Sequence, residues 1–261
     1  MIRQAPGTQP PDPPGPEADW PAAAAVANEA GASDWLLVCE HASRHIPAEY
    51  GRLGLPPGAE RAHIGWDIGA AALTRALAAR MDAAAVTARY SRLLIDLNRP
   101  TGAPSSIPVR SEATDIPGNL DLDPRERARR VARIFDPFHA ELRRVLDARA
   151  AAGRRTRLLT VHSFTPVFLG RARPWHLGVL SGASRALAAR LLEAVGAESP
   201  DLCLALDEPY VVDDASDYAI PVHGDGRGLD ALLIEVRNDL LRGDDDVMLW
   251  AERLSRALAR L

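Results

Sequence analysis

Short apolar runs alternate with longer segments of helical spacing along most of this chain. The run WLLVC at 35–39 is continuously apolar, which is typical of a strand buried on both faces of a sheet. Similar strand-like runs follow at 83–88, 92–97, 157–161, 176–180, 202–206 and 231–236. Apolar residues three and four apart predict helices at 68–81, from Asp123 to about 145, at 184–195 and from about 245 to 261. This alternation predicts an α/β layered fold with a largely parallel sheet.

The first 30 residues lack this pattern. Residues 1–20 are rich in proline and the next stretch is mostly alanine, so the segment buries too little apolar surface to offset its ordering entropy. We therefore expect a flexible Pro/Ala-rich tail at 1–30 and a single α/β domain at 31–261. A domain of that size needs no disulfides to fold.

Composition and charge exclude several classes of protein. The 261 residues carry a formal net charge of −4, so a dedicated nucleic-acid binder, which needs a strong basic excess, is not expected. No apolar run approaches the roughly 20 residues of a membrane span. Cys39 and Cys203 match no CxxC pattern and lie in apolar runs, so we expect two buried, reduced thiols. These features predict a soluble, cytoplasmic protein.

Polar side chains follow four of the predicted strands, at or near the point where each strand ends. They are Glu40 and His41, Asn98 and Arg99, His162 and Ser163, and Glu235. In an open α/β sheet, ligands bind beyond the carboxyl ends of the strands, so we expect these side chains to face one crevice. Each also has a structural interpretation, as a hydrogen-bonded strand-end residue or as half of an ion pair. No G-x-S-x-G elbow is present, so a serine hydrolase of the α/β type is not expected.

The two histidines of this set, His41 and His162, and Glu235 suit a metallohydrolase. Catalytic zinc typically has three His or Asp/Glu ligands and one open position. It lowers the pKa of a water molecule, and a nearby carboxylate takes the proton. We therefore interpret His41 and His162 as zinc ligands and Glu235 as the base.

Asp67 is the candidate for the third ligand. It lies in H-I-G-W-D-I-G, directly before the predicted helix at 68–81, so capping that helix is an equally good interpretation. His63 and Glu40 are the reserve candidates for the metal.

Arginine beside a strand suggests a site for a substrate carboxylate. Arg99 presents a planar fork that matches a carboxylate with two parallel hydrogen bonds, and Asn98 adds a neutral donor. Arg92, at the other end of the same predicted strand, is a further candidate, although a surface salt bridge explains it equally well. Ser163, beside His162, completes the candidates for substrate binding.

The glycine-rich run G-D-G-R-G at 224–228 precedes a strand instead of opening a helix, so it is a poor phosphate cradle. We interpret it as a mobile loop near the site, with His223 and Tyr218 facing substrate. His139 and His176 are interpreted as structural.

Five segments of the chain resemble the N-formylglutamate amidohydrolase family. They are E-H-A-S at 40–43, W-D-I-G at 66–69, S-R-L-L-I-D-L-N-R-P at 91–100, T-V-H-S-F at 160–164 and I-E-V-R-N-D-L at 234–240. The segments follow the family's order and span the chain from 35 to about 240. The pattern S-R-x-x-I-D-x-N-R-P is the most specific of them.

This resemblance implies a fold, a metal and a reaction. The family is similar in fold to the zinc carboxypeptidases, which implies a three-layer, phosphorylase/hydrolase-like sandwich of zinc exopeptidase type, with helices on both faces of a mostly parallel mixed sheet. By that resemblance His41 and His162 bind zinc and Glu235 is the general base. The pair Asn98 and Arg99 resembles the Asn-Arg pair that holds a substrate carboxylate in those peptidases. The implied reaction is hydrolysis of N-formyl-L-glutamate to formate and glutamate.

Two departures separate this chain from the family members that act in histidine degradation. Those enzymes carry Pro-His-Ser-Gly where this chain has E-H-A-S at 40–43, and Trp-His where it has Trp66 and Asp67. Aspartate and histidine both bind zinc, so one metal ion per chain is still implied, whereas the substrate stays open, with N-formyl-L-glutamate as the leading candidate. The alternatives are a deacylase or carboxypeptidase acting on another N-acyl amino acid or peptide, and a non-catalytic binding protein on the same fold. The sequence does not indicate an oligomeric state.

Overall fold

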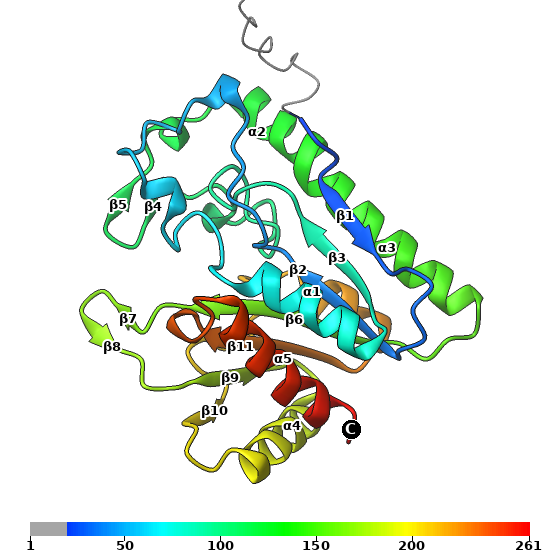
Figure 1. The fold of residues 1–261 in the computed structure, drawn as a ribbon. Helices are drawn as coiled ribbons and strands as arrows, with labels where there is room; N and C mark the ends of the chain where they lie inside the picture. The colour runs from blue at the N-terminus through cyan, green and yellow to red at the C-terminus, as the bar shows by residue number, and fades with distance from the viewer. Residues whose placement is uncertain (1–19) are drawn as a thin grey trace, which may run out of the picture.

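A seven-stranded sheet runs through the centre of the computed structural model, which describes residues 20–261 (Figure 1). Its strands are β1 (Ala24–Ala27), β2 (Trp35–Cys39), β3 (Ala84–Ala88), β6 (Arg157–Phe164), β9 (Leu177–Leu180), β10 (Leu204–Leu206) and β11 (Ala231–Arg237). They lie in the order β1-β3-β2-β6-β11-β9-β10. Only the β1–β3 and β9–β11 pairs of this sheet are antiparallel. The predicted mostly parallel, mixed sheet is therefore confirmed.

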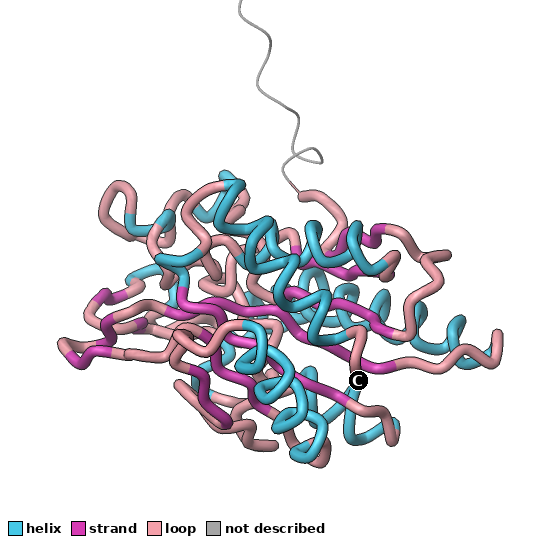
Figure 2. The backbone as a smooth tube through the Cα atoms, turned by 60° about the horizontal axis from the view of Figure 1, so that its bottom comes forward, coloured by secondary structure: helices cyan, strands magenta, loops and turns pink. Residues whose placement is uncertain are grey.

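Helices cover both faces of this sheet (Figures 1 and 2). Along β2, Leu36 and Val38 belong to the apolar core on the side of α3 (Asp136–Ala151), whereas Trp35 and Leu37 belong to the core beneath α1 (Ala70–Met81), α4 (Arg185–Glu198) and α5 (Asp244–Leu258). A strand buried in this alternating way has no polar face, which explains the continuously apolar sequence. The three-layer α/β architecture is confirmed. The helices are α1 (Ala70–Met81), α2 (Pro124–Arg130), α3 (Asp136–Ala151), α4 (Arg185–Glu198) and α5 (Asp244–Leu258).

Shorter elements lie in the connections. A π-helical turn at Val131–Phe135 joins α2 to α3, and two small hairpins project from the domain. The hairpins are β4 (Arg110–Ser111) with β5 (Thr114–Asp115), and β7 (Val167–Phe168) with β8 (Arg171–Ala172). The other short helical turns are at Ala48–Tyr50, Ala59–Arg61, Pro104–Ser106, Pro117–Asn119, Ala219–Gly224, Asp225–Arg227 and Asn238–Leu240.

The end of the predicted N-terminal tail packs on the domain. Strand β1 lies inside the range 1–30 and pairs antiparallel with β3, with Ala24 opposite Ala88. Alanine contributes little side-chain burial, but main-chain hydrogen bonds along a sheet edge order this stretch without it. Residues 1–19, the remainder of the predicted tail, lie outside the described residues.

The segment 92–97, predicted as a strand, is instead a series of turns. Its four apolar side chains are buried as expected. The Leu94 N–H donates to the Ser91 carbonyl oxygen at 3.0 Å, and the Asn98 N–H donates to Asp96 Oδ1 at 2.9 Å. The strand prediction is wrong because an apolar run indicates burial but not backbone conformation, and local hydrogen bonds satisfy this backbone.

Two smaller expectations also need correction. Cys39 is buried, but Cys203 is exposed, because it lies just before the short edge strand β10. The glycine-rich run 224–228 contains a helical turn at Asp225–Arg227, and Asp225 Oδ2 accepts a hydrogen bond from the Ala183 N–H at 3.0 Å. Among residues 20–261, no helix combines the length and apolar character needed to cross a membrane.

Candidate active site

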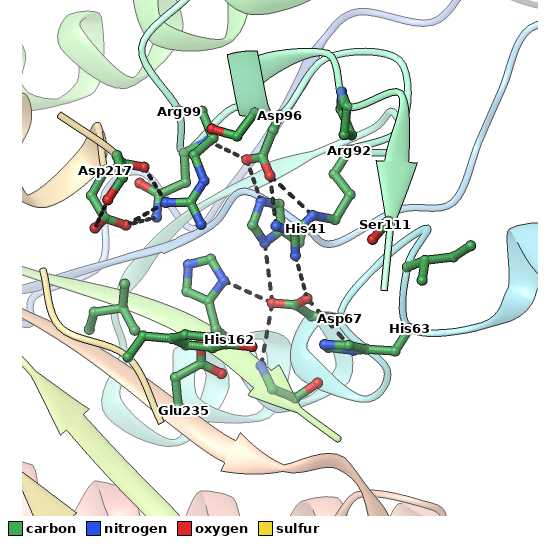
Figure 3. Close-up of a pocket in the computed structure, with 18 of the residues that line it drawn as sticks. His41, His63, Asp67, Arg92, Asp96, Arg99, Ser111, His162, Asp217 and Glu235 are labelled. Atoms are coloured by element: carbon green, nitrogen blue, oxygen red, sulfur yellow. Dashed lines mark hydrogen bonds and ion pairs between the residues drawn. The ribbon is translucent and has the colours of Figure 1, made fainter. Parts of the chain in front are cut away.

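Strand ends and one loop bring the predicted ligands together (Figure 3). His41 follows β2 by two residues, and His162 lies near the end of β6, which is parallel to β2. The neighbouring strand β11 places Glu235 directly opposite His162. The loop before α1 joins this edge through a hydrogen bond of 2.9 Å from the Asp67 N–H to the His41 carbonyl oxygen.

The three predicted metal ligands converge on one point. Asp67 Oδ2 lies 3.3 Å from His41 Nδ1 and 2.8 Å from His162 Nδ1. One ligand atom from each residue lies within 4.8 Å of the other two, and all three side chains are buried. The alternative for Asp67 is wrong, since α1 begins after Gly69 and has no side-chain cap.

A second layer of carboxylates surrounds the two histidines. His41 Nε2 lies 2.7 Å from Asp96 Oδ1, and His162 Nε2 lies 3.1 Å from Glu40 Oε2. The Glu40 contact has the distance of an ion pair without hydrogen-bond geometry. Carboxylates in this position fix the tautomer and orientation of metal-binding histidines. Glu40, a reserve metal candidate, thus contacts the ring nitrogen that faces away from Asp67.

The donor atoms of this cluster fit a divalent cation. When the histidine protons lie on Nε2, facing Asp96 and Glu40, both Nδ1 atoms present lone pairs. Asp67 Oδ2 then faces two other acceptors, an arrangement that a shared cation would stabilise. Two imidazoles and one carboxylate are a typical ligand set for zinc with an open position. His41, Asp67 and His162 are therefore the residues that could hold such an ion.

Charge interactions dominate within this buried cluster. Burial opposes ionisation of Asp67, but the two histidines outweigh it and hold the pKa of this carboxyl well below its usual range. Burial likewise opposes protonation of His162, but Asp67 and Glu40 outweigh it and raise its pKa. The cluster thus favours an anionic Asp67 and attracts positive charge, either protons or a metal ion.

Glu235 lies beside this cluster and has a different electrostatic environment. Its side chain lines the pocket, and Oε2 is buried with no hydrogen-bond partner among the described residues. Burial raises the pKa of Glu235 to about 7, although the nearby histidines lower it. A carboxylate with a pKa near neutrality and a free oxygen suits the transfer of a proton to and from a substrate.

The two candidate arginines have different partners. Arg92 donates from Nε and Nη2 to Asp96 Oδ2 at 3.1 and 2.7 Å, and from Nη1 to Asp67 Oδ1 at 3.4 Å. Arg99 donates only from Nη1, to Asp217 Oδ1 at 3.0 Å and to the Ser216 carbonyl oxygen. Both line the pocket, but only Arg99 has nitrogens, Nε and Nη2, that make no hydrogen bond within residues 20–261.

Asn98 also lines the pocket, and protein groups occupy its amide. Its Oδ1 accepts hydrogen bonds from the Tyr218 and Ala219 N–H groups, and its Nδ2 donates to Asp217 Oδ1 at 3.2 Å. Ser163 lies at the pocket wall and donates to the Ile68 carbonyl oxygen at 2.8 Å. Both residues therefore hold the walls of the site together.

The remaining candidates lie at the rim or behind the wall. His63 lines the pocket with Nδ1 3.9 Å from Asp67 Oδ1, and burial lowers its pKa to about 4. The pocket lining does not include His223 or Tyr218, so the expectation that they face substrate is wrong. His223 instead forms a buried 2.9 Å hydrogen bond with His139. His176 accepts a hydrogen bond from the Cys203 N–H, a structural contact.

Among the residues of the site that were not predicted, Asp96, Asp217 and Tyr210 carry polar groups. Asp96 orients His41, and its position inside S-R-x-x-I-D-x-N-R-P was a signal that could have identified it. Asp217 and Tyr210 line the pocket from the segment between β10 and the helical turn at 219–224, which has no strand-end pattern. The pocket has a volume of about 430 Å³ and reaches from the ligand cluster to the β4–β5 hairpin.

Together, the mixed sheet and the crevice at its strand ends place this chain among the α/β proteins whose pocket lies at the carboxyl ends of the strands. Residues 33–242 match the N-formylglutamate amidohydrolase family, and the chain belongs to that family. This match confirms the resemblance seen in the sequence motifs. No curated protein matches the sequence.

Solved structures that are similar to the chain include two with high coverage of both chains. A crystal structure of a gene product from Agrobacterium tumefaciens is 40% identical, covers 94% of this chain and 97% of its own, and has a TM-score of 0.88. The N-formylglutamate amidohydrolase from Ralstonia eutropha JMP134 is 18% identical, covers 92% of this chain and 99% of its own, and has a TM-score of 0.61. The second similarity supports the fold alone.

Proposed function

We propose that this protein is a metal-dependent amidohydrolase that cleaves the amide bond of an N-acyl amino acid. The observation that carries the proposal is the convergence of His41 Nδ1, Asp67 Oδ2 and His162 Nδ1 next to Glu235. One zinc ion per chain suits these ligands. When bound, it would polarise the acyl oxygen and lower the pKa of the attacking water.

Glu235 supplies the proton transfers in this proposal. Its unpaired Oε2 is a suitable acceptor for the proton of the attacking water, and the protonated carboxyl then delivers that proton to the leaving amine. Asp96 and Glu40 hold the two histidines in the orientation that the ligands need. Arg99, with two nitrogens that have no partner among residues 20–261, is the candidate that receives the substrate's carboxylate.

Membership of the family makes N-formyl-L-glutamate the leading candidate substrate. The alternatives are other N-acyl amino acids or short peptides, because Asp67 and E-H-A-S at 40–43 differ from the motifs of the histidine-degrading members. A panel of N-formyl, N-acetyl and N-succinyl amino acids, scored by release of the free amine with zinc present, tests this choice. The expected result is amine release from the N-formyl compound. No release from any compound would contradict the proposed activity.

A non-catalytic binding protein is the second candidate function. It would keep the fold and the pocket but would not need a buried carboxylate such as Glu235, whose Oε2 has no hydrogen-bond partner among the described residues. Such a protein would bind members of the panel without releasing amine.

A further inference from the structure

Arg99 has one fixed edge and one free edge. Its Nη1 donates to Asp217 Oδ1 at 3.0 Å and to the Ser216 carbonyl oxygen, so the chain segment 216–217 uses both N–H groups of that nitrogen. Nε and Nη2 lie on the other edge, and about a quarter of the side chain is exposed in the pocket wall. These two nitrogens have the spacing that binds both oxygens of a carboxylate.

Asp217 is itself held firmly in place. Its Oδ1 accepts from Asn98 Nδ2 at 3.2 Å as well as from Arg99, and its Oδ2 accepts from the Asp213 N–H at 3.0 Å. Asn98 in turn accepts a hydrogen bond of 2.9 Å from the Ala219 N–H. The segment 213–219 and the pair Asn98–Arg99 therefore form one connected hydrogen-bonded unit, far apart in sequence but joined at the pocket.

We propose that Asp217 is a positioning residue for substrate recognition, which fixes the guanidinium of Arg99 so that its free edge points at the substrate's carboxylate. This proposal rests on the proposed function, because it assigns a role within the same amide-hydrolysing site. A long arginine side chain loses much rotamer freedom when it binds a ligand. A carboxylate that already holds one edge removes that cost before the substrate arrives.

Arg92, in contrast to Arg99, uses all of its guanidinium nitrogens for contacts within the protein. Each of its three guanidinium nitrogens donates to Asp96 or Asp67, so its donors serve the carboxylates of the buried cluster. In the part of the chain that the structure describes, every guanidinium nitrogen of Arg92 has a protein partner, whereas two nitrogens of Arg99 have none. Selectivity for a carboxylate therefore depends on Arg99 and on the residue that aligns it.

The test compares two ligands that differ in one charge, N-formyl-L-glutamate and its α-carboxamide. Kinetics are measured with zinc-loaded wild type and Asp217→Asn, and binding of both compounds is measured by calorimetry in a Glu235→Gln background, which does not require turnover. Asp115→Asn is the matched control, because Asp115 pairs with pocket-lining Arg110 at 2.8 Å but is exposed to solvent. Thermal unfolding of each variant checks that the fold is retained.

We expect Asp217→Asn to raise KM and Kd for the carboxylate compound about tenfold, the size of effect produced by losing one charge-assisted hydrogen-bond alignment. The kcat for the carboxylate compound should change less than about twofold, and so should KM and Kd for the carboxamide. Tighter binding of the carboxylate by Asp217→Asn would overturn the proposal, because it would show that Asp217 competes with the substrate for Arg99. Equal losses for both compounds, unchanged binding, or binding of neither compound to any protein would also overturn it.

The binding measurement separates this proposal from the proposed function. If no protein releases amine from any compound, the hydrolytic function fails. The difference between the two ligands in the calorimetric experiment still decides the role of Asp217.

Discussion

Arg92 and Arg99 belong to the same motif and have similar side-chain exposure, 23% and 26%, yet they belong to different regions of the pocket. Arg92 is part of the ligand cluster region, defined by His41, Asp67, Asp96, His162 and Glu235, and all three of its guanidinium nitrogens donate to Asp96 or Asp67. Arg99 is part of the recognition region, defined by Asn98, Arg99 and Asp217, in which Nε and Nη2 of the guanidinium make no hydrogen bond within residues 20–261. The contrast teaches that the hydrogen-bond partners of an arginine, more than its residue type or its place in a motif, determine its role.

The contrast between the two regions predicts different kinetic consequences. Substitutions in the ligand cluster region should reduce kcat or metal binding, because these groups hold the reacting centre. Substitutions in the recognition region should raise KM, because they remove ground-state contacts to the substrate.

The largest effect is expected for Glu235→Gln. The amide keeps the size of the side chain but cannot accept the water's proton, so kcat should fall by about 100–1000-fold, as for loss of other transition-state contacts. Zinc content should stay equal to that of wild type, because Glu235 is not one of the three converging ligands. Normal kcat in this variant would show that another residue acts as the base.

Asp96→Asn tests the second layer of carboxylates. Its Oδ1 faces His41 Nε2, and loss of such an outer partner typically lowers metal affinity or activity by about 10–100-fold. Zinc affinity measured by competition with a chelating dye should show this weakening. Asp115→Asn, on the exposed β4–β5 hairpin, is the control. Equal zinc affinity and activity in both variants would show that Asp96 does not support metal binding through His41.

Arg92→Met and Arg99→Met compare the two regions directly. Arg99→Met should raise KM for a carboxylate substrate by about 10–100-fold, the value of one or two hydrogen bonds to a charged group, with a smaller change in kcat. Arg92→Met should instead lower kcat and zinc affinity, because it leaves Asp96 without its cationic partner. Steady-state kinetics on both variants measure this split. A rise in KM alone for both variants would contradict the assignment of Arg92 and Arg99 to regions with different roles.

The smallest effect is expected from a buried pair outside both regions. Burial lowers the pKa of His139 to about 3 and that of His223 to about 4. The unfolded chain therefore binds these protons more readily, so their contribution to stability is present above pH 6.5 and declines as the pH falls toward 4. His139→Gln should flatten this decline in urea unfolding between pH 7 and 5. An unchanged slope would show that other groups cause the acid sensitivity.

The sequence predicted the sheet and the ligand cluster region better than the recognition region. Buried strands leave an apolar pattern, and His41, His162 and Glu235 lie where those patterns end. Asp67 was an open choice between cap and ligand, because both roles suit an acidic residue before a helix. Only the three-dimensional structure shows that its side chain faces two histidines.

Other features left no local signal. The pairing of Asp217 with Arg99 joins residues 118 positions apart, and neither hydrophobic periodicity nor a motif connects them. The turns at 92–97 depend on Asp96 and its hydrogen bonds, which an apolar pattern does not reveal. The edge strand β1 depends on main-chain pairing with β3 and not on its alanine side chains.

The most direct test of the central claim is the zinc content of wild type and Asp67→Ala, purified without chelators and titrated with zinc under identical conditions. The account predicts about one tightly bound zinc ion per wild-type chain, in accordance with a three-ligand site, and a large loss of affinity in the variant. A wild-type chain that takes up no zinc, or an Asp67→Ala chain that binds it as tightly as wild type, would contradict the assignment of His41, Asp67 and His162 as the metal site.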